Sequence, residues 1–278
     1  MSAGERPDGR SVRMIATDID GTMLRSDGSL APRVKAALEA AAEAGIHVVP
    51  ATGRPLLITH DVIDQLGLDD YWVFANGAVT RHLRRDELIR GFWMDHEVTR
   101  DLLGLLRRDL PGAGFAIEFE DTVAFEPGFE QVVPNPPDEP PVDDLAAALH
   151  DSEVHWQRVQ KILVYDLNLD VEALYRRVSQ VVGKRAAPSY SGLNFIELAA
   201  GVVTKATALD LLARDLGIDA SEVISFGDNH NDLAMLRWAG RGYAMANATA
   251  DAKAAADEVI GFNDDDALAV KIEELLEG

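Results

Sequence analysis

Two aspartates separated by a single residue follow an apolar segment near the start of the chain. The stretch RMIATDIDGTMLRSDG (residues 13–28) places Asp18 and Asp20 directly after residues 14–17, which we expect to form a short buried strand. Carboxylates this close repel each other unless a cation binds beside them, so the arrangement costs stability when no partner is present. The pattern therefore predicts a site that holds positive charge.

Three more polar clusters follow apolar segments that read as strands. In an open parallel α/β sheet, ligands bind beyond the carboxyl ends of the strands, so we expect these clusters to meet at one edge. They are Thr52-Gly53-Arg54, Asn76-Gly77 and the run Gly227-Asp228-Asn229-His230-Asn231-Asp232.

The residue types in these clusters suit phosphoryl transfer. Asp18 and Asp228 would supply carboxylate oxygens from two separate strands to a hard divalent cation such as Mg²⁺. One of the two neighbouring aspartates can act as a nucleophile, and a carboxylate two positions on can exchange protons with the leaving group and with water. The Thr52 hydroxyl and Lys205, at a helix start, could hold the transferred group.

The elements that position these residues alternate between strand and helix, with strands that are apolar throughout. This order is typical of a parallel sheet covered on both faces, and we predict an α/β fold with a Rossmann-like core. Expected strands are 14–17, 46–54, 71–78, 222–232 and 241–248, of which 46–54, 71–78 and 222–232 run into polar turns. Expected helices are 30–45, 204–217, 233–240 and 264–278.

The middle of the chain has a different pattern of expected strands and helices. Three strand-like stretches alternate there with two amphipathic helical patterns, 98–110 and 170–183, and the loop at 134–141 is dense in proline. We therefore predict an inserted α+β domain over residues 82–191, with residues 1–81 and 192–278 forming the core. The polar stretch 1–12 is expected to be a disordered tail.

Composition excludes several classes of function. The formal net charge of −21 argues against a nucleic-acid or anionic-membrane binder, because both need a cationic surface. The chain contains no cysteine, which excludes disulfides and thiolate chemistry, and no apolar run long enough to span a membrane. We expect a cytoplasmic protein, monomeric or homodimeric.

The four motifs resemble those of the haloacid dehalogenase (HAD) superfamily. DIDGT (18–22), ATGRP (51–55), Lys205 at a helix start and GDNHNDLAML (227–236) stand in the usual order and separation of that superfamily. The long insert, together with FANGA and the GDNxND form of the last motif, resembles the Cof-type subfamily (subfamily IIB) with its C2-type cap domain. One departure is Thr204-Lys205-Ala206, where the family commonly has Ser-Lys-Gly.

The resemblance implies a role for each matching residue. Asp18 would be the nucleophile, and Asp20 the acid/base whose backbone carbonyl also faces the metal. Asp228 would bind Mg²⁺, and Asp232 would support the metal shell or Lys205. The remaining roles fall to Thr52, which would hydrogen-bond the phosphoryl group, to Lys205, which would offset charge, and to Gly53, Arg54, Asn76, Gly77 and Asn231 as substrate-binding candidates.

Some of these residues have an alternative explanation. Asp232 and Asn231 could cap the helix that follows them, and Arg54 and Asn76 could pair a carboxylate or satisfy loop backbone.

The expected function is a Mg²⁺-dependent phosphatase that hydrolyses small phosphomonoesters through an aspartyl-phosphate. The resemblance suggests sugar phosphates or phosphorylated cofactors as substrates, so the expected partner is a small phosphorylated metabolite. The cap would exclude water and select the leaving group. One alternative passes the phosphoryl group to another hydroxyl, as in a phosphomutase. Another is a catalytically idle regulator that binds a metabolite at the same site.

Overall fold

The computed structural model describes residues 11–120, 122–134, 137–149, 158–201 and 203–277. These residues group into two compact units. Unit 1 contains the described residues up to Arg54, Ile58–Arg90 and those from Thr204 onward, and unit 2 contains Pro55–Leu57 and Gly91–Val203. None of the helices in the described part of the chain is long and apolar enough to cross a bilayer.

The boundaries of unit 2 differ from those predicted for the inserted domain, residues 82 and 191, because of two strands. Strand β5 (Glu87–Gly91) neighbours β4 (Val79–His82) in a sheet of unit 1, so residues 82–90 stay with that unit. Strand β10 (Phe195–Ala200) pairs with β8 (Lys161–Tyr165) in unit 2, which extends that unit past residue 191.

The expected disordered tail needs a correction at its end. Residues 1–10 lie outside the described residues. Val12, however, is only 1% exposed, and the backbone N–H of Arg13 donates to Glu222 O at 2.9 Å. Burial of the apolar Val12 side chain therefore anchors the chain in the fold two residues before strand β1 (Met14–Thr17) begins.

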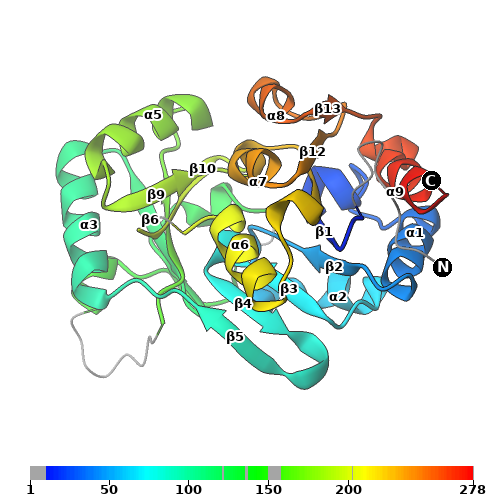
Figure 1. The fold of residues 1–278 in the computed structure, drawn as a ribbon. Coiled ribbons are helices and arrows are strands. Elements are labelled where there is room, and N and C mark those ends of the chain that lie inside the picture. Colours follow the sequence, from blue (N-terminus) through cyan, green and yellow to red (C-terminus); the bar gives the residue numbers. More distant parts are fainter. Residues whose placement is uncertain (1–10, 121, 135–136, 150–157, 202, 278) are drawn as a thin grey trace. The chain divides into compact units, whose positions relative to one another are not determined.

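The main sheet of unit 1 is parallel, in the order β13-β12-β11-β1-β2 (Figure 1). Every residue of the two central strands β1 and β11 is buried, as the unbroken apolar sequences predicted. The carboxyl ends of the parallel strands share one edge, which is where the site is built. The strands are β1 (Met14–Thr17), β2 (His47–Pro50), β11 (Val223–Gly227), β12 (Arg241–Ala244) and β13 (Glu258–Val259).

Helices flank this sheet. The first and last, α1 and α9, lie side by side (Figure 1) and are joined by an ion pair of 2.5 Å between Arg33 and Glu273. Helix α1 is rich in alanine and begins at Pro32, whose fixed φ suits a first helical position. The helices of unit 1 are α1 (Pro32–Glu43), α2 (His60–Leu66), α6 (Lys205–Asp215), α7 (Leu233–Trp238), α8 (Ala250–Ala255) and α9 (Ala267–Glu277).

The third expected parallel strand is only loosely joined to the main sheet. Strand β3 (Tyr71–Phe74) pairs antiparallel with β4 in a separate sheet, β3-β4-β5. Its parallel link to the segment after β2 is one bridge between Ala51 and Val73, with Thr52 N donating to Val73 O at 2.8 Å. The link suffices to bring the turn after β3 beside the turn after β2.

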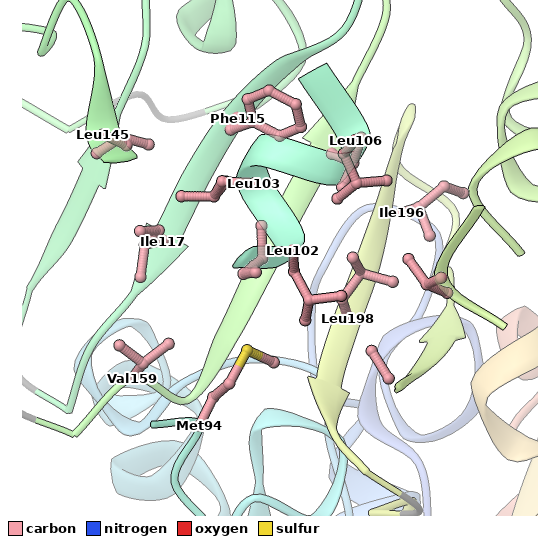
Figure 2. Close-up of a cluster of buried hydrophobic side chains, with 14 of the residues drawn as sticks. Met94, Leu102, Leu103, Leu106, Phe115, Ile117, Leu145, Val159, Ile196 and Leu198 are labelled. Atoms are coloured by element: carbon pink, nitrogen blue, oxygen red, sulfur yellow. The ribbon is translucent and has the colours of Figure 1, made fainter. Parts of the chain in front are cut away.

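Unit 2 is a five-stranded antiparallel sheet with helices packed on one face, an α+β arrangement. Figure 2 shows Leu102, Leu103 and Leu106 of α3 packed with Phe115, Ile117, Ile196 and Leu198 of the sheet. The strand order is β7-β6-β8-β10-β9. The elements not yet given are α3 (His96–Asp109), β6 (Gly114–Glu118), β7 (Val123–Phe125), α4 (Leu145–Ala148), α5 (Val171–Val182) and β9 (Ala186–Ser189).

The sheet of unit 2 also carries a buried charged cluster. Lys161 Nζ lies 3.0 Å from Glu118 Oε2 and 2.6 Å from Glu197 Oε2, and all three side chains are buried. Burial raises the pKa of Glu118 to about 7; Lys161 opposes this shift and Glu197 adds to it. Folded protein therefore holds the Glu118 proton over a pH range in which the unfolded chain releases it.

This shift predicts a pH-dependent stability. Because the folded pKa of Glu118 exceeds the usual 4.5, its contribution is full below pH 4.5 and is lost as pH rises to about 7. We expect the free energy of unfolding of wild type, relative to Glu118→Gln, to fall by about 3 kcal/mol across that range. Urea denaturation at several pH values checks this, and a difference that does not change with pH would contradict it.

Candidate active site

The predicted clusters do follow the strands of unit 1. Asp18 comes directly after β1, Thr52 lies two residues past β2, and Asp228 comes directly after β11. Asp18 N donates to Phe226 O at 3.0 Å, which continues the pairing of β1 with β11 as far as the site. The parallel register thus sets Asp18 beside Asp228, although 209 positions separate Asp18 from Gly227, the last residue of β11.

Lys205 joins two carboxylates. Its Nζ lies 2.5 Å from Asp18 Oδ1 and 2.7 Å from Asp232 Oδ1, and its side chain is fully buried. Lys205 begins α6, where the helix dipole disfavours a cation, so the carboxylates compensate for that position. Burial alone would lower the pKa of Lys205, but Asp18 and Asp232 together raise it above its usual value, so the ammonium stays charged.

Three buried carboxylates form a possible metal-binding group. One oxygen from each of Asp18, Asp228 and Asp232 lies within 4.8 Å of the others. Burial raises the pKa of Asp18 well above its usual value, and Asp232 raises it further against the opposing effect of Lys205. Burial, and next Asp232, raises the pKa of Asp228 to about 6. One lysine does not offset three carboxylates, so an added cation would stabilise the group.

The hydrogen bonds of Asp232 indicate a different role from that of Asp18 and Asp228. Asp232 Oδ1 accepts from Lys205, and Oδ2 accepts from the backbone N–H groups of Asp228 and Asn229, each at 3.0 Å. Asp232 thus holds both Lys205 and the turn that carries Asp228. It also caps that turn in a reciprocal arrangement with Asn229, so the capping function and the site function coincide.

The turn from Ile19 to Met23 fits closely against Asp228. Thr22 Oγ1 donates to Asp228 Oδ1 at 2.8 Å, a contact not predicted from the sequence although Thr22 belongs to the DIDGT motif. Gly21 has φ +78°, and a Cβ there would lie 2.6 Å from Asp228 Oδ2. Only glycine therefore permits this approach of the turn to Asp228.

Asp20 lies outside the group of three carboxylates. Its side chain is 45% exposed and receives a two-pronged ion pair from Arg54, whose Nε donates to Asp20 Oδ2 at 2.8 Å and whose Nη2 donates to Oδ1. Thr52 Oγ1 accepts from Arg54 N at 3.0 Å, and Ala75 N donates to Arg54 O at 3.0 Å. The Thr52-Gly53-Arg54 turn thus places the guanidinium of Arg54 against the carboxylate of Asp20.

Asn76, Gly77 and Asn231 are brought together at the start of α6. Asn231 Nδ2 donates to Asn76 Oδ1 at 3.0 Å, and Asn76 adopts a left-handed conformation with φ +56°. A Cβ on Gly77 would lie 2.3 Å from Thr204 O, so glycine lets this turn approach the helix that carries Lys205. Asn231 Oδ1 is buried and accepts no hydrogen bond from the described residues.

The structure explains why Thr204-Lys205-Ala206 can replace the Ser-Lys-Gly that is common in the family. Thr204 is the N-cap of α6, and its side chain accepts from Thr207 N at 3.1 Å. Ala206 is the second residue of the helix, where no left-handed conformation is needed. Alanine therefore serves as well as glycine at this position.

One further contributor, Asn247, is not among the residues predicted from the sequence. Its Nδ2 donates to Gly21 O at 2.7 Å, so it touches the turn between Asp20 and Thr22. A signal was present: Asn247 follows β12, the next parallel strand beyond β11, at the same edge of the sheet. The predicted strand over residues 241–248 is too long: β12 ends at Ala244, so Asn247 lies in the turn after it.

Comparison with known proteins identifies the class. A family model described as haloacid dehalogenase-like hydrolase matches residues 15–272. The chain belongs to this family, as its four motifs predicted, and it is an enzyme of the phosphatase class. The fold class, a Rossmann-like α/β core with an inserted α+β cap domain, is confirmed as well.

Individual relatives carry phosphatase names. Pyridoxal phosphate phosphatase YbhA of Escherichia coli (strain K12) is 28% identical, over 93% of this chain and 97% of its own. Phosphatase YwpJ of Bacillus subtilis (strain 168) is also 28% identical, over 95% of this chain and 100% of its own. A solved structure of a haloacid dehalogenase-like hydrolase from B. subtilis superposes with a TM-score of 0.81, at 25% identity, over 95% of this chain and 100% of that one.

Proposed function

We propose that the protein is a Mg²⁺-dependent phosphatase that hydrolyses small phosphomonoesters through an aspartyl-phosphate on Asp18. The observation that carries this proposal is the buried contact of Lys205 with both Asp18 and Asp232, next to Asp228. A lysine in that position offsets negative charge where an anionic phosphoryl group must approach a carboxylate.

Asp18 and Asp20 divide the chemistry between them. Asp18 Oδ1 is held by Lys205, which leaves its second oxygen to attack phosphorus and form the aspartyl-phosphate. Asp20, two residues on and far more exposed, protonates the leaving oxygen and then takes a proton from the attacking water. Splitting the transfer in this way replaces one difficult step by two easier ones.

The oxygen-only donor set fits a hard divalent cation. Asp18 and Asp228 would hold Mg²⁺ directly, with the backbone carbonyl of Asp20 as a third protein ligand, and Asp232 would hold the surrounding groups in place. When bound, the ion offsets the charge of the phosphate oxygens and lowers the repulsion between nucleophile and substrate. Asp228 is aligned for this by Thr22, which occupies its Oδ1.

The substrate would be a small phosphorylated metabolite, a sugar phosphate or a phosphorylated cofactor. With a net charge of −21, the protein attracts an anion only where cations or N–H donors gather. Lys205, Arg54 and the Asn231–Asn76 pair provide such a place. The name of the YbhA relative, a pyridoxal phosphate phosphatase, supports the cofactor class.

A phosphate-release assay over a panel of phosphomonoesters tests the proposal. We expect release with Mg²⁺, loss of release after EDTA, and recovery when Mg²⁺ is restored. Asp228→Asn should need at least about tenfold more Mg²⁺ for half-maximal rate, because a neutral amide is a weaker ligand than a carboxylate.

Three outcomes would contradict this function. Equal rates of phosphate release with and without EDTA would show that the reaction does not require a metal ion. Isomerised hexose phosphate in place of free phosphate would favour the phosphomutase alternative. Tight binding of a panel member without turnover would favour the idle regulator.

A further inference from the structure

The segment that follows β12 contacts both halves of the proposed site. Asn247 Nδ2 donates to Gly21 O at 2.7 Å, on the turn that carries Asp20 and Thr22. Two positions on, Thr249 N donates to Asp228 O at 2.9 Å. A single short segment thus holds the backbone of the Asp20 turn and the backbone of Asp228.

A second asparagine completes this arrangement. Asn263 N donates to Asn247 Oδ1 at 3.2 Å, and Asn263 Nδ2 donates to Leu24 O at 2.9 Å. The turn itself is closed by Leu24 N donating to Ile19 O at 2.9 Å. The two asparagines therefore support the turn at its middle, through Gly21, and at its end, through Leu24.

We propose that Asn247 is a positioning residue for the reaction: it holds the Gly21 carbonyl and thereby sets Asp20 and Thr22 relative to Asp228. This inference rests on the proposed phosphatase function. Gly21 has no side chain of its own to restrain its peptide groups, and its neighbours carry the acid/base and the hydroxyl that aligns Asp228. An external hydrogen bond to Gly21 O restricts rotation of the adjacent peptide.

Because Asn247 is exposed, an experiment can distinguish a role in positioning the turn from a role in packing. Its side chain lies at the surface, so truncation leaves no cavity, and an exposed hydrogen bond contributes little to global stability. A purely structural residue in this place would therefore change neither the rate nor the melting temperature much. A positioning residue would change the rate while the melting temperature stays nearly the same.

The test compares Asn247→Ala and Asn247→Asp with wild type. Asn247→Asp keeps an acceptor for Asn263 N but places a carboxylate against Gly21 O, so its effect should equal or exceed that of Asn247→Ala. We expect kcat for the best panel substrate to fall about 10- to 100-fold, with KM within about threefold and the melting temperature within about 4 °C. Hydrogen exchange of the amides in residues 19–24 should become faster.

Asn194→Asp is the matched control. Asn194 Nδ2 donates to a backbone oxygen, that of Leu169, at 3.3 Å within unit 2, so its replacement removes the same kind of bond away from the site. It should leave kcat and exchange at residues 19–24 unchanged. The proposal is overturned if both Asn247 variants keep kcat within about twofold of wild type, or if exchange in the turn does not change. If wild type releases no phosphate, the proposed function fails, and the exchange measurement still tests separately whether Asn247 restrains residues 19–24.

Discussion

Asp18→Asn is expected to lower phosphate release by at least about 10⁴-fold, because an amide cannot attack phosphorus in place of the carboxylate. The variant should still fold. Burial and the neighbouring carboxylates penalise the charge of Asp18, which appears as its raised pKa, and Lys205 retains Asp232 as a partner. Single-turnover and steady-state phosphate release, with a thermal melt of the same sample, check both expectations.

Asp166→Asn is the control for Asp18→Asn. Asp166 is also a buried aspartate, 8% exposed, but it lies in unit 2 and accepts from Asn168 N at 2.9 Å. This variant should keep its activity. Full activity in Asp18→Asn would show that Asp18 is not the nucleophile. If the variant lost activity because it unfolded, the result would show only that Asp18 supports the fold.

Lys205→Met is expected to have the largest effect on stability. The substitution keeps an apolar stem of similar length and leaves Asp18 and Asp232 buried with no cation between them. Removal of one partner from a buried charge network costs about 3–5 kcal/mol, so we expect the free energy of unfolding to fall by that amount. Phosphate release should disappear as well. Urea denaturation at neutral pH measures the change.

Lys271→Met is matched to this variant. Lys271 also contacts two carboxylates, Glu258 at 3.1 Å and Glu274 at 2.8 Å, but its partners are 36% and 58% exposed. Exposed pairs contribute little, so the loss should stay below about 1 kcal/mol. Equal losses in the two variants would contradict the view that Lys205 is needed chiefly because its partners are buried.

Local patterns predicted the core elements well. Residues 14–17 form β1 as expected, and helices α1 and α6 lie within the predicted ranges 30–45 and 204–217. Apolar runs, Pro32 at a helix start and the alternation of elements are local signals. The pairing of β3 with β4 and the place of β10 in unit 2 depend on contacts between strands, which such signals do not record.

The residue types of the site could also be predicted, but their partners could not. Motif order indicated Asp18, Asp228 and Lys205. The side-chain pairing of Asp20 with Arg54, and the division of labour between Asp228 and Asp232, depend on side-chain directions in folded turns. The place of Asn247 after a strand of the parallel sheet was a signal for the site edge, but its contact with Gly21 spans 226 positions and ends on a backbone oxygen, so the sequence did not indicate that contact.

The most direct test of the account is to trap the phosphoryl group on the chain. Asp20→Asn, mixed with Mg²⁺ and p-nitrophenyl phosphate, should still form the aspartyl-phosphate, because nitrophenolate leaves without protonation, while water attack slows for lack of a base. We predict a burst of about one nitrophenol per enzyme, and borohydride reduction followed by mass spectrometry should find homoserine at position 18. Turnover without a burst, or a modification at any other residue, would contradict Asp18 as the nucleophile.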